Sequence, residues 1–385
     1  METVVLNVNP PAKSRIALTV FFFISGFGYS SWASRIPTIQ QQLHLNEAQL
    51  GAVLFAAPVG LLLTMPLTSY LLGRVNSRKI LITGAAAFNL VLCFPGFATQ
   101  TWQLAAALFC FGSTRNLMNL SANSQAVGVQ QLYDKSIMTT FHGMWSLAGF
   151  AGAAFGYLMV TFNVAPGYHL LAVSLVLLLL SLYFYSNTLD QEPVQQGKKP
   201  IFSLPDKHLM KFAIICFCCM SCENTMYDWS VIYFQKAIHA SNPVATSAFV
   251  IYMVMMTIGR FTGDKLVNKI GIKKLLNASG WLIFTGLFLA VLLPNPIPAA
   301  VGFAMVGLGV SCIVPLVFSL AGRSKTMSSG QALASISTVG YIGFLMVPPL
   351  VGFVAQALNL RWSFGIIALL GAVIILMVSK IREEE

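Results

Sequence analysis

The stretch that decides the fold reads GRFTGDKLVNKIGIKK and covers residues 259–274. It is rich in lysine and arginine, contains one acidic residue, and lies between two long apolar runs at 243–259 and 275–293. A bilayer core of about 30 Å needs roughly 20 apolar residues when they form a helix. The two runs are therefore predicted to cross a membrane, with the basic stretch joining them on one side.

Apolar runs of this kind recur along the whole chain. Backbone groups cannot stay unpaired in lipid, and no alternating barrel strands are present, so each run is predicted to be a helix. The fold class expected is an all-α membrane protein with 12 transmembrane helices. The runs are 16–34, 48–72, 80–98, 102–129, 137–161, 168–186, 212–235, 243–259, 275–293, 297–322, 330–358 and 362–379.

Composition excludes other classes of protein. Of the 385 residues, 56% are hydrophobic and 9% are charged, whereas a soluble domain carries about 25% charged residues. A water-soluble enzyme would lack the charge to cover its surface, and a disordered chain needs low hydrophobicity. The net charge of +11 is spread over short gaps between apolar runs, so it orients a membrane protein and does not indicate nucleic acid as a partner.

The distribution of lysine and arginine predicts the orientation. If the N-terminus is cytoplasmic and the runs alternate, 19 of the 23 basic residues lie in inner segments and Arg115 lies within a span. The outer segments then hold Arg35, Lys236 and Arg361. The positive-inside rule therefore places both termini in the cytoplasm.

The chain divides into two halves that resemble each other. A polar stretch separates six runs from six, which predicts an N-terminal bundle at 1–186, a cytoplasmic linker at 187–210 and a C-terminal bundle at 211–385. A shift of 191 residues aligns Ser146-x-x-Gly149-Phe150-x-Gly152 with Ser337-x-x-Gly340-Tyr341-x-Gly343, and it also aligns Arg74 with Lys265. Parallel six-span repeats build one large transporter fold.

The stretch 259–274 resembles the signature loop of the major facilitator superfamily, in which glycines and an aspartate are followed by basic residues and another glycine. The resemblance covers essentially the whole chain. It implies a secondary transporter that works by alternating access, with the solute site between the two halves. The segments MNLSANSQAV (118–127) and FHGMWSL (141–147) further resemble a bacterial branch near the fucose-permease-type carriers.

The two basic loops are predicted to form a cytoplasmic gate. Gly259 and Gly263 allow helices to approach closely, and Asp264 can latch onto a neighbouring helix end or a basic partner. The alternative is a solvated loop with an incidental acid. The first-half loop (69–79) has Gly73 in place of the aspartate, so the gate is expected to be asymmetric. The gate residues predicted are Gly259, Arg260, Gly263, Asp264, Lys265, Arg74 and Arg78.

An ionisable side chain within a span indicates function, because its burial is costly. Arg115 lies thirteen residues beyond Trp102, and Glu223 lies twelve beyond Lys211. At 1.5 Å per residue these depths are ~20 Å and ~18 Å, so the two groups are predicted to meet. Glu223 would carry a coupling proton, and Arg115 would hold solute or steady the carboxylate. The alternative is a fixed ion pair that only locks two helices.

Two further ionisable groups have open interpretations. Asp228 lies about 140° around the helix from Glu223 and is an outer gate, a second proton site, a partner for Arg35 or a snorkelling acid. His142 begins span 5 and is either a proton relay or a neutral group bonded to a neighbouring helix.

Uncharged polar and aromatic residues complete the predicted site. Asn119 and Asn123 are one turn apart, and amides both donate and accept hydrogen bonds, which suits hydroxyl-rich solutes. The alternative is that they hold helices together. Tyr29, Trp32 and Trp145 either stack on a sugar ring or mark the membrane interface.

The function predicted is a proton-coupled symporter of a small polar solute such as a sugar, and the alternative is a proton-coupled exporter of drugs or metabolites. No phosphate-cradling loop is present, so ATP is not expected to drive transport. The cysteines at 216, 218, 219 and 222 are interpreted as apolar filler, and neither a metal nor a cofactor is expected. We expect a monomer in the bacterial inner membrane whose partners are the solute, protons and lipid.

Overall fold

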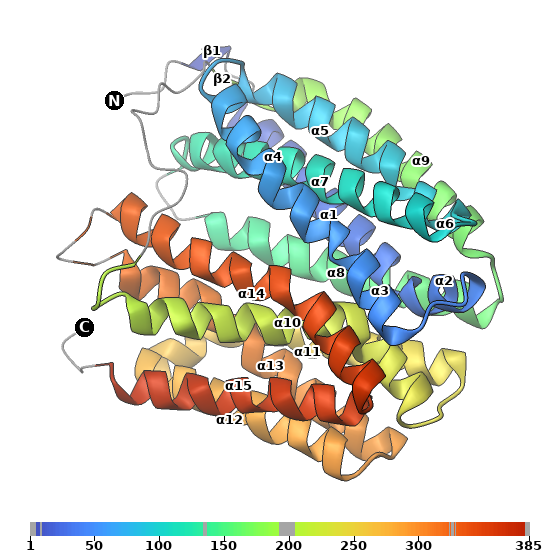
Figure 1. The fold of residues 1–385 in the computed structure, drawn as a ribbon. Coiled ribbons are helices and arrows are strands. Elements are labelled where there is room, and N and C mark those ends of the chain that lie inside the picture. The colour runs from blue at the N-terminus through green and yellow to red at the C-terminus, as the bar shows by residue number, and fades with distance from the viewer. Residues whose placement is uncertain are drawn as a thin grey trace. The chain divides into compact units, whose positions relative to one another are not determined.

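The computed structural model describes residues 5–7, 10–133, 137–191, 205–322, 324, 327 and 329–381. Within these ranges, nothing is described of the side chains at 5–7, 139, 191, 264, 329 and 330. The predicted latch side chain, Asp264, therefore lies outside the described residues, as does most of the predicted linker. Figure 1 shows the order of the elements.

The chain forms two compact units. The first comprises 1–44 and 56–198 and contains all elements before α10 except α3. Strand β1, near the N-terminus, pairs antiparallel with β2, which follows α9 and η1. Its elements are β1 (Val5–Asn7), α1 (Pro11–Ala33), α2 (Ile36–Gln42), α4 (Ala56–Leu72), α5 (Ser77–Leu92), α6 (Phe94–Phe97), α7 (Thr101–Gln130), α8 (Met138–Thr161), α9 (Pro166–Phe184), η1 (Tyr185–Asn187) and β2 (Asp190–Gln191).

The second unit comprises 45–55 and 199–385. In the part of it that the structure describes, its regular elements are helices, and they include the short helix α3 from the first half of the chain. Its elements are α3 (Glu47–Leu54), α10 (Met210–Lys236), α11 (Asn242–Ile270), α12 (Ile272–Leu292), α13 (Pro296–Ala321), α14 (Ser329–Ala357) and α15 (Leu360–Ser379).

The same pairs of helices pack in both units. In the first unit, α1 packs on α8, α4 on α7 and α5 on α9. In the second, the corresponding pairs are α10 with α14, α11 with α13 and α12 with α15. The internal repeat predicted from the sequence is therefore present in the packing.

The glycines of the repeated motif explain one of these pairs. A Cβ atom on Gly152 of α8 would lie 2.5 Å from the carbonyl oxygen of Phe27 on α1. A Cβ atom on Gly343 of α14 would lie 2.6 Å from the carbonyl oxygen of Phe217 on α10. Small residues let membrane helices approach to backbone contact, so each glycine is required for the close crossing of its pair.

Within the described residues, ten helical segments are long and apolar enough to cross a membrane. The predicted runs 102–129 and 212–235 coincide with α7 and α10, which are not among these ten. At 1.5 Å per residue, α7 and α10 are ~45 Å and ~40 Å long, more than the ~30 Å of a bilayer core. The count of twelve spans and the cytoplasmic termini stay predictions.

The second predicted run, 48–72, is not one helix. It is divided at Phe55 into α3 and α4. Pro58 has no N–H to bond the carbonyl of Leu54, and its ring crowds that carbonyl, which accounts for the break. The first half of the chain is consequently not continuous as a unit, because 45–55 belongs to the second one.

The predicted loop at 260–274 is mostly helical. Helix α11 continues to Ile270 and α12 begins at Ile272, so Gly271 alone joins them. Gly271 has φ 84° and ψ 157°, a combination that is essentially restricted to glycine. The apolar run ends at Gly259 while helical structure continues to Ile270, so the end of the run did not mark the end of the helix. The first residues of the predicted linker likewise form η1 and β2.

Replacing Gly271 with alanine is expected to destabilise the protein by about 1–3 kcal/mol, because a Cβ atom strains this conformation. Nothing lies within 4 Å of the position such a Cβ would take, so crowding would not contribute. Gly365 of α15 is the matched control, since its Cβ site is equally open and its backbone is helical. Gly365→Ala is expected to raise the apparent melting temperature in detergent and Gly271→Ala to lower it. Equal shifts in the two variants would contradict the backbone argument.

Candidate functional site

Helices α7 and α10 carry most of the polar side chains predicted for the site. Arg115, Asn119 and Asn123 lie on α7, and Glu223 and Asp228 lie on α10. These charges and amides lower the apolarity of the two helices. Ionisable groups within a membrane helix avoid lipid and face protein or a water-filled cavity, so these helices are the natural place to look for solute chemistry.

In the first unit, the Arg115 guanidinium lies over the ring of Tyr29. Its central carbon is 3.9 Å from the ring centroid. Tyr29 is buried and is itself stacked 6.3 Å from the ring of Phe111. A desolvated contact between a cation and an aromatic face contributes roughly 2 kcal/mol. Among the described residues, the arginine charge is therefore held by an aromatic face, and its Nε is buried without a hydrogen bond.

A hydrogen-bonded chain joins three helices beside this pair. The Ser25 hydroxyl of α1 donates to Oδ1 of Asn119 at 2.8 Å, and Trp145 Nε1 of α8 donates to the same hydroxyl at 3.3 Å. These bonds fix the orientation of the Asn119 amide. Its Nδ2 makes no hydrogen bond within the described residues and is partly exposed. Asn119 thus presents a fixed donor one turn from Arg115.

The other residues predicted in this unit lie elsewhere. Trp32 is 3% exposed and packs against Phe111 in the core. Asn123 is exposed and donates to the carbonyl of Asn119 on its own helix. His142 is exposed near the start of α8, with its ring edge-on to Phe22. The structure therefore does not bring these three into the Arg115 cluster.

In the second unit, Glu223 pairs with Arg260. The carboxylate Oε1 of Glu223 on α10 is 3.8 Å from the guanidinium of Arg260 on α11, and each side chain is 19% exposed. Arg260 had been predicted in an inner loop. It lies ten residues, ~15 Å, before the end of α11. The four-residue spacing of Gly259 and Gly263 was the signal that the helix continues.

Each member of the predicted Arg115–Glu223 pair thus has a partner in its own unit. Arg115 belongs to the first unit and Glu223 to the second, so their mutual contact stays a prediction. Arg35, the alternative partner considered for Asp228, donates to Nδ1 of His169 at 2.8 Å and to the carbonyl of Val164 at 2.7 Å, both in the first unit.

Asp228 is almost buried, with 9% of its surface exposed. It accepts a hydrogen bond from Nδ2 of Asn224 at 3.1 Å, and the same nitrogen reaches the carbonyl of Phe344 on α14 at 3.4 Å. Because both partners of that nitrogen are acceptors, the amide orientation is fixed. Asn224 Oδ1 is then left buried without a donor. Sequence reasoning missed Asn224, although its four-residue spacing from Asp228 places both on one face.

The residues predicted to form the gate in the second unit lie on α11. A Cβ atom on Gly259 would be 2.2 Å from the hydroxyl of Ser311, and one on Gly263 would be 2.5 Å from the sulfur of Cys312. The two glycines therefore allow α11 and α13 to pack closely, as predicted. Lys265, two residues after Gly263, is exposed.

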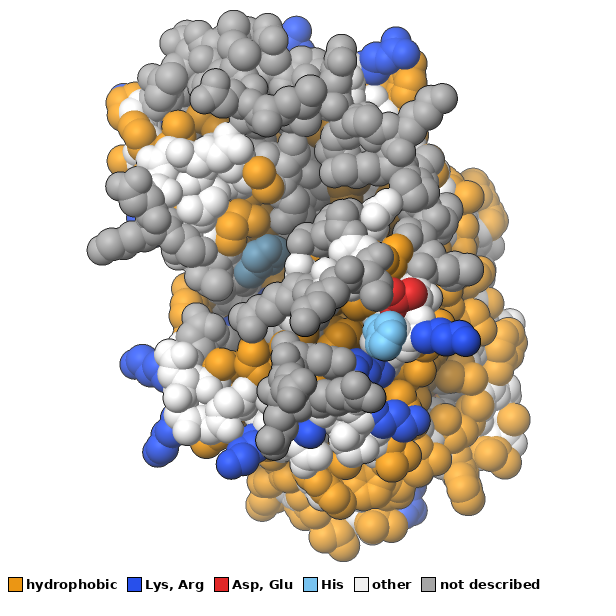
Figure 2. All heavy atoms as spheres, turned by 90° about the vertical axis from the view of Figure 1, so that its left-hand side faces the viewer, with side chains coloured by type: hydrophobic (Ala, Val, Ile, Leu, Met, Phe, Trp, Pro, Cys, Tyr) orange, Lys and Arg blue, Asp and Glu red, His pale blue; other side chains and the backbone are white. Residues whose placement is uncertain are grey.

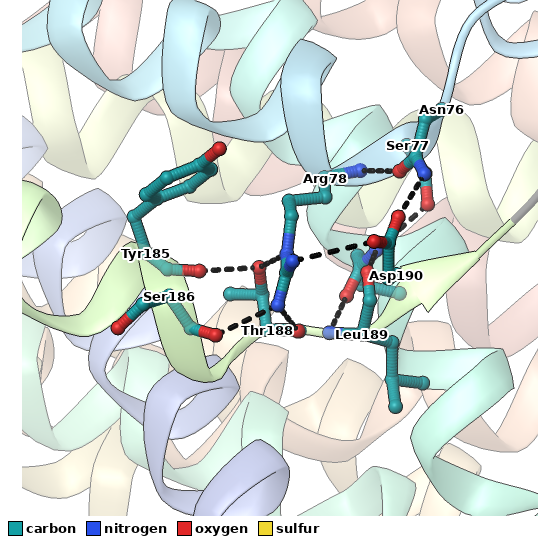
Figure 3. A network of polar contacts seen from close by, with 9 residues as sticks. Asn76, Ser77, Arg78, Tyr185, Ser186, Thr188, Leu189 and Asp190 are labelled. Atoms are coloured by element: carbon teal, nitrogen blue, oxygen red, sulfur yellow. Dashed lines mark hydrogen bonds and ion pairs between the residues drawn. The ribbon is translucent and has the colours of Figure 1, made fainter. Parts of the chain in front are cut away.

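The corresponding gate region of the first unit is a polar network around Arg78 (Figure 3). Its guanidinium donates to the hydroxyl of Thr188 at 3.2 Å, to the carbonyl of Ser186 at 2.7 Å and to the carbonyl of Thr188. A further nitrogen lies 3.6 Å from a carboxylate oxygen of Asp190. The other oxygen of Asp190 accepts from Nδ2 of Asn76.

The network supplies the acid that the first-half loop lacks. Asp190 follows α9, far along the chain from the loop that it reaches. Gln125 of α7 holds the same segment by accepting from the backbone N–H of Leu189 at 2.9 Å and donating to its carbonyl at 2.9 Å. Arg74 takes no part; its guanidinium lies over the ring of Tyr70, 5.1 Å from the centroid.

A comparison with protein families decides the identity of the fold. The model of the major facilitator superfamily matches residues 18–326 and 213–385. The chain belongs to the major facilitator superfamily. It is therefore a transporter and not an enzyme, and it is a multi-pass protein of the bacterial inner membrane.

Relatives of this transporter agree with the assignment. An uncharacterized transporter of the same superfamily from Yersinia pestis is 31% identical over 94% of both chains. The membrane protein MosC of Rhizobium meliloti is 29% identical over 96% of this chain and 90% of its own. A Helicobacter pylori protein, provisionally named a glucose/galactose transporter, is 26% identical over 74% of this chain and 64% of its own.

Solved structures share the fold of the transporter. The nucleoside transporter NupG superposes with a TM-score of 0.75, 13% identity and coverage of 95% of this chain and 98% of its own. A bacterial homologue of the human lysosomal transporter Spinster, in an inward-facing unoccupied state, superposes with a TM-score of 0.74 and 13% identity. The match covers 97% of this chain and 98% of that chain. At such low identity these likenesses concern the fold alone.

Replacing Arg78 with alanine is expected to free the segment 185–190. Hydrogen bonds to charged groups contribute about 1.5–3 kcal/mol, and Arg78 is partly exposed, so we expect roughly tenfold faster amide hydrogen exchange there. Arg78→Lys should give an intermediate rate, because an ammonium cannot reproduce the guanidinium fork. Arg74→Ala is the matched control and should leave exchange unchanged. The role assigned to Arg78 fails if both alanine variants exchange alike.

Proposed function

We propose that this transporter moves a small hydroxyl-bearing solute together with a proton by alternating access. The observation that carries the proposal is the ion pair between Glu223 and Arg260 within the second unit. A carboxylate inside a membrane helix bundle is costly unless it has a task or a partner. Here the Glu223 carboxylate is paired with Arg260 on the neighbouring helix, and neutralising the carboxylate would remove the ion pair.

Protonation of Glu223 would change how strongly α10 and α11 are held together, because the ion pair with Arg260 joins these two helices. An ionised Glu223 attracts Arg260 and holds α10 to α11 at this depth, since an opposite charge nearby stabilises the ionised form. A proton on Glu223 removes the attraction, so charge no longer holds α10 to α11 at this position. Because a ligand shifts a conformational equilibrium only by binding one state better, the proton acts as a ligand for the state in which the pair is broken.

The polar groups of both units suit a hydroxyl-bearing solute. The first unit offers donors, namely Nδ2 of Asn119 and the guanidinium of Arg115. The second offers acceptors, namely Oδ1 of Asn224, which is buried without a donor, and the carboxylate of Asp228 beside it. A hydroxyl both donates and accepts, so it can pair with either set.

The relatives support this solute class. One relative is provisionally named a glucose/galactose transporter; NupG, with which this chain shares the fold alone, is a nucleoside transporter. Sugars and nucleosides both carry several hydroxyls on a ring. The ring of Trp145, which is half-buried and is linked through the Ser25 hydroxyl to Asn119, is the aromatic surface that such a ring would meet.

Glu223→Gln tests the coupling role, because it keeps the size of the side chain and removes its charge. In proteoliposomes containing a pH-sensitive dye, we expect glucose, galactose or uridine to drive protons inward with the wild type. The glutamine variant should reduce this proton movement at least tenfold while solute exchange without a gradient persists.

Glu47→Gln is the matched control for that experiment. Glu47 also forms an ion pair, with Lys236 at 2.6 Å, but it lies in the first turn of the short helix α3 and not in the middle of a long helix. The control should retain proton movement. Unchanged proton movement in Glu223→Gln contradicts the coupling role, and protons moving against the solute would favour the exporter. No proton movement with any of the three solutes contradicts the solute class.

Asn119 and Asn116 allow solute binding to be separated from helix packing. Nδ2 of Asn116 donates to the Thr68 hydroxyl at 3.0 Å and is buried, whereas Nδ2 of Asn119 is free. Asn119→Ala should raise the KM for the transported solute roughly three- to tenfold, the loss of one hydrogen bond. Asn116→Ala should lower the melting temperature and leave KM unchanged. The reverse pattern would exclude Asn119 from the solute site.

A further inference from the structure

A groove of about 700 Å³ lies where α12 begins and α15 ends. Seven of its lining residues belong to α12 and follow one face of that helix, from Lys273 to Thr285. Helix α15 contributes only Val378 and Ser379, so the rest of this face of α12 stays uncovered. Both helices belong to the second unit.

The polarity of the groove changes in one direction. Lys273 and Lys274 lie at its first end, Asn277 follows, then Trp281, and Leu282 and Thr285 end it. From Lys273 to Thr285 the helix rises ~18 Å. Trp281 is 49% exposed, and exposed tryptophans gather at the level of lipid headgroups. The groove thus runs from cationic through interfacial to apolar.

The two lysines are not engaged elsewhere. Within the described residues, neither Lys273 nor Lys274 forms an ion pair or a hydrogen bond, and the first turn of α12 holds no acidic residue. They lie at the end of the unit that the lysine and arginine distribution predicts to be cytoplasmic. Figure 2, which views the side of Figure 1 where α15 ends, shows Lys and Arg side chains together with broad hydrophobic surface.

We propose that this groove binds one anionic phospholipid of the inner leaflet. The headgroup phosphate lies against Lys273 and Lys274, the glycerol region against Asn277 and Trp281, and an acyl chain against Leu282. Basic pockets between membrane helices on the cytoplasmic side bind anionic headgroups. A free phosphate would satisfy the lysines but would leave the apolar half of the groove empty, so the sequence of lining groups selects a lipid.

Binding is expected to stabilise the second unit, because a ligand that binds only the folded state adds to its stability. It would also fix the depth of α12 in the membrane, since the headgroup level is defined at Trp281. This site is separate from the Glu223–Arg260 pair on α10 and α11, and it does not depend on the solute or on proton coupling.

The test is a titration of the purified full-length transporter in detergent with phosphatidylglycerol. We expect the apparent melting temperature to rise and native mass spectrometry to retain one phosphatidylglycerol molecule. Each lysine near an anionic headgroup contributes about a factor of five in affinity. The double variant Lys273→Gln with Lys274→Gln should therefore need about 30-fold more lipid for the same shift.

The matched control is the double variant Lys207→Gln with Lys269→Gln. Both lysines are exposed in the second unit and lie outside the groove, and the variant loses the same net charge. It should retain the wild-type response. An equal loss in the two double variants would overturn the proposal, as would an equal shift with phosphatidylcholine of the same chains or with inorganic phosphate alone.

Tryptophan fluorescence gives a second readout that does not rely on stability. Phosphatidylglycerol brominated on its acyl chains should quench part of the emission, and Trp281→Phe should remove the quenched part. The chain has six tryptophans, so the variant remains fluorescent. Unchanged quenching in Trp281→Phe would place the lipid elsewhere and would also overturn the proposal.

Discussion

The structure depends on how charge is held inside a helical bundle that lipid surrounds. Hydrocarbon offers no hydrogen bonds and little dielectric screening, so each buried ion needs a partner from the protein. Arg115 has the ring of Tyr29, and Glu223 has Arg260. These are different solutions. An aromatic face holds a cation whatever the pH, whereas an ion pair exists only while the acid is ionised. This difference is the basis for the coupling role proposed for α10.

The fold was largely predictable because its determinants are local in sequence. Apolar runs of sufficient length must be helices in lipid, and each predicted run coincides with helical structure. The internal repeat was visible because close crossings require glycine at equivalent positions, as Gly152 and Gly343 show. A break or kink at Pro58 was predictable, because proline removes a backbone donor. Which proline breaks its helix was not, since Pro66, Pro315 and Pro348 lie inside helices that continue past them.

The partners within the site were not predictable, because they depend on which helices pack together. Arg260 was assigned to a loop, since the apolar run ended while the helix continued to Ile270. Asp190 was assigned to a linker, although the segment carrying it folds back onto Arg78. Asn224 shares a helix face with Asp228, but its second partner, the carbonyl of Phe344 on α14, depends on helix packing that the sequence does not show. In each case the sequence showed the polar residue but not the side chain or backbone group that it contacts in the fold.

The charged groups of the second unit have different kinds of partner inside the bundle and at its end. Inside the bundle, Glu223 and Arg260 satisfy each other, and the Asp228 carboxylate accepts from Asn224. At the end of the bundle, Lys273 and Lys274 have no protein partner among the described residues, yet they border an amphipathic groove. A protein cation left uncompensated at the headgroup level costs little because anionic lipid is abundant there. Internal ions must be paired by the chain, and peripheral ones can be paired by the membrane. The same helical unit can therefore use its buried charges for coupling and its surface charges for placement.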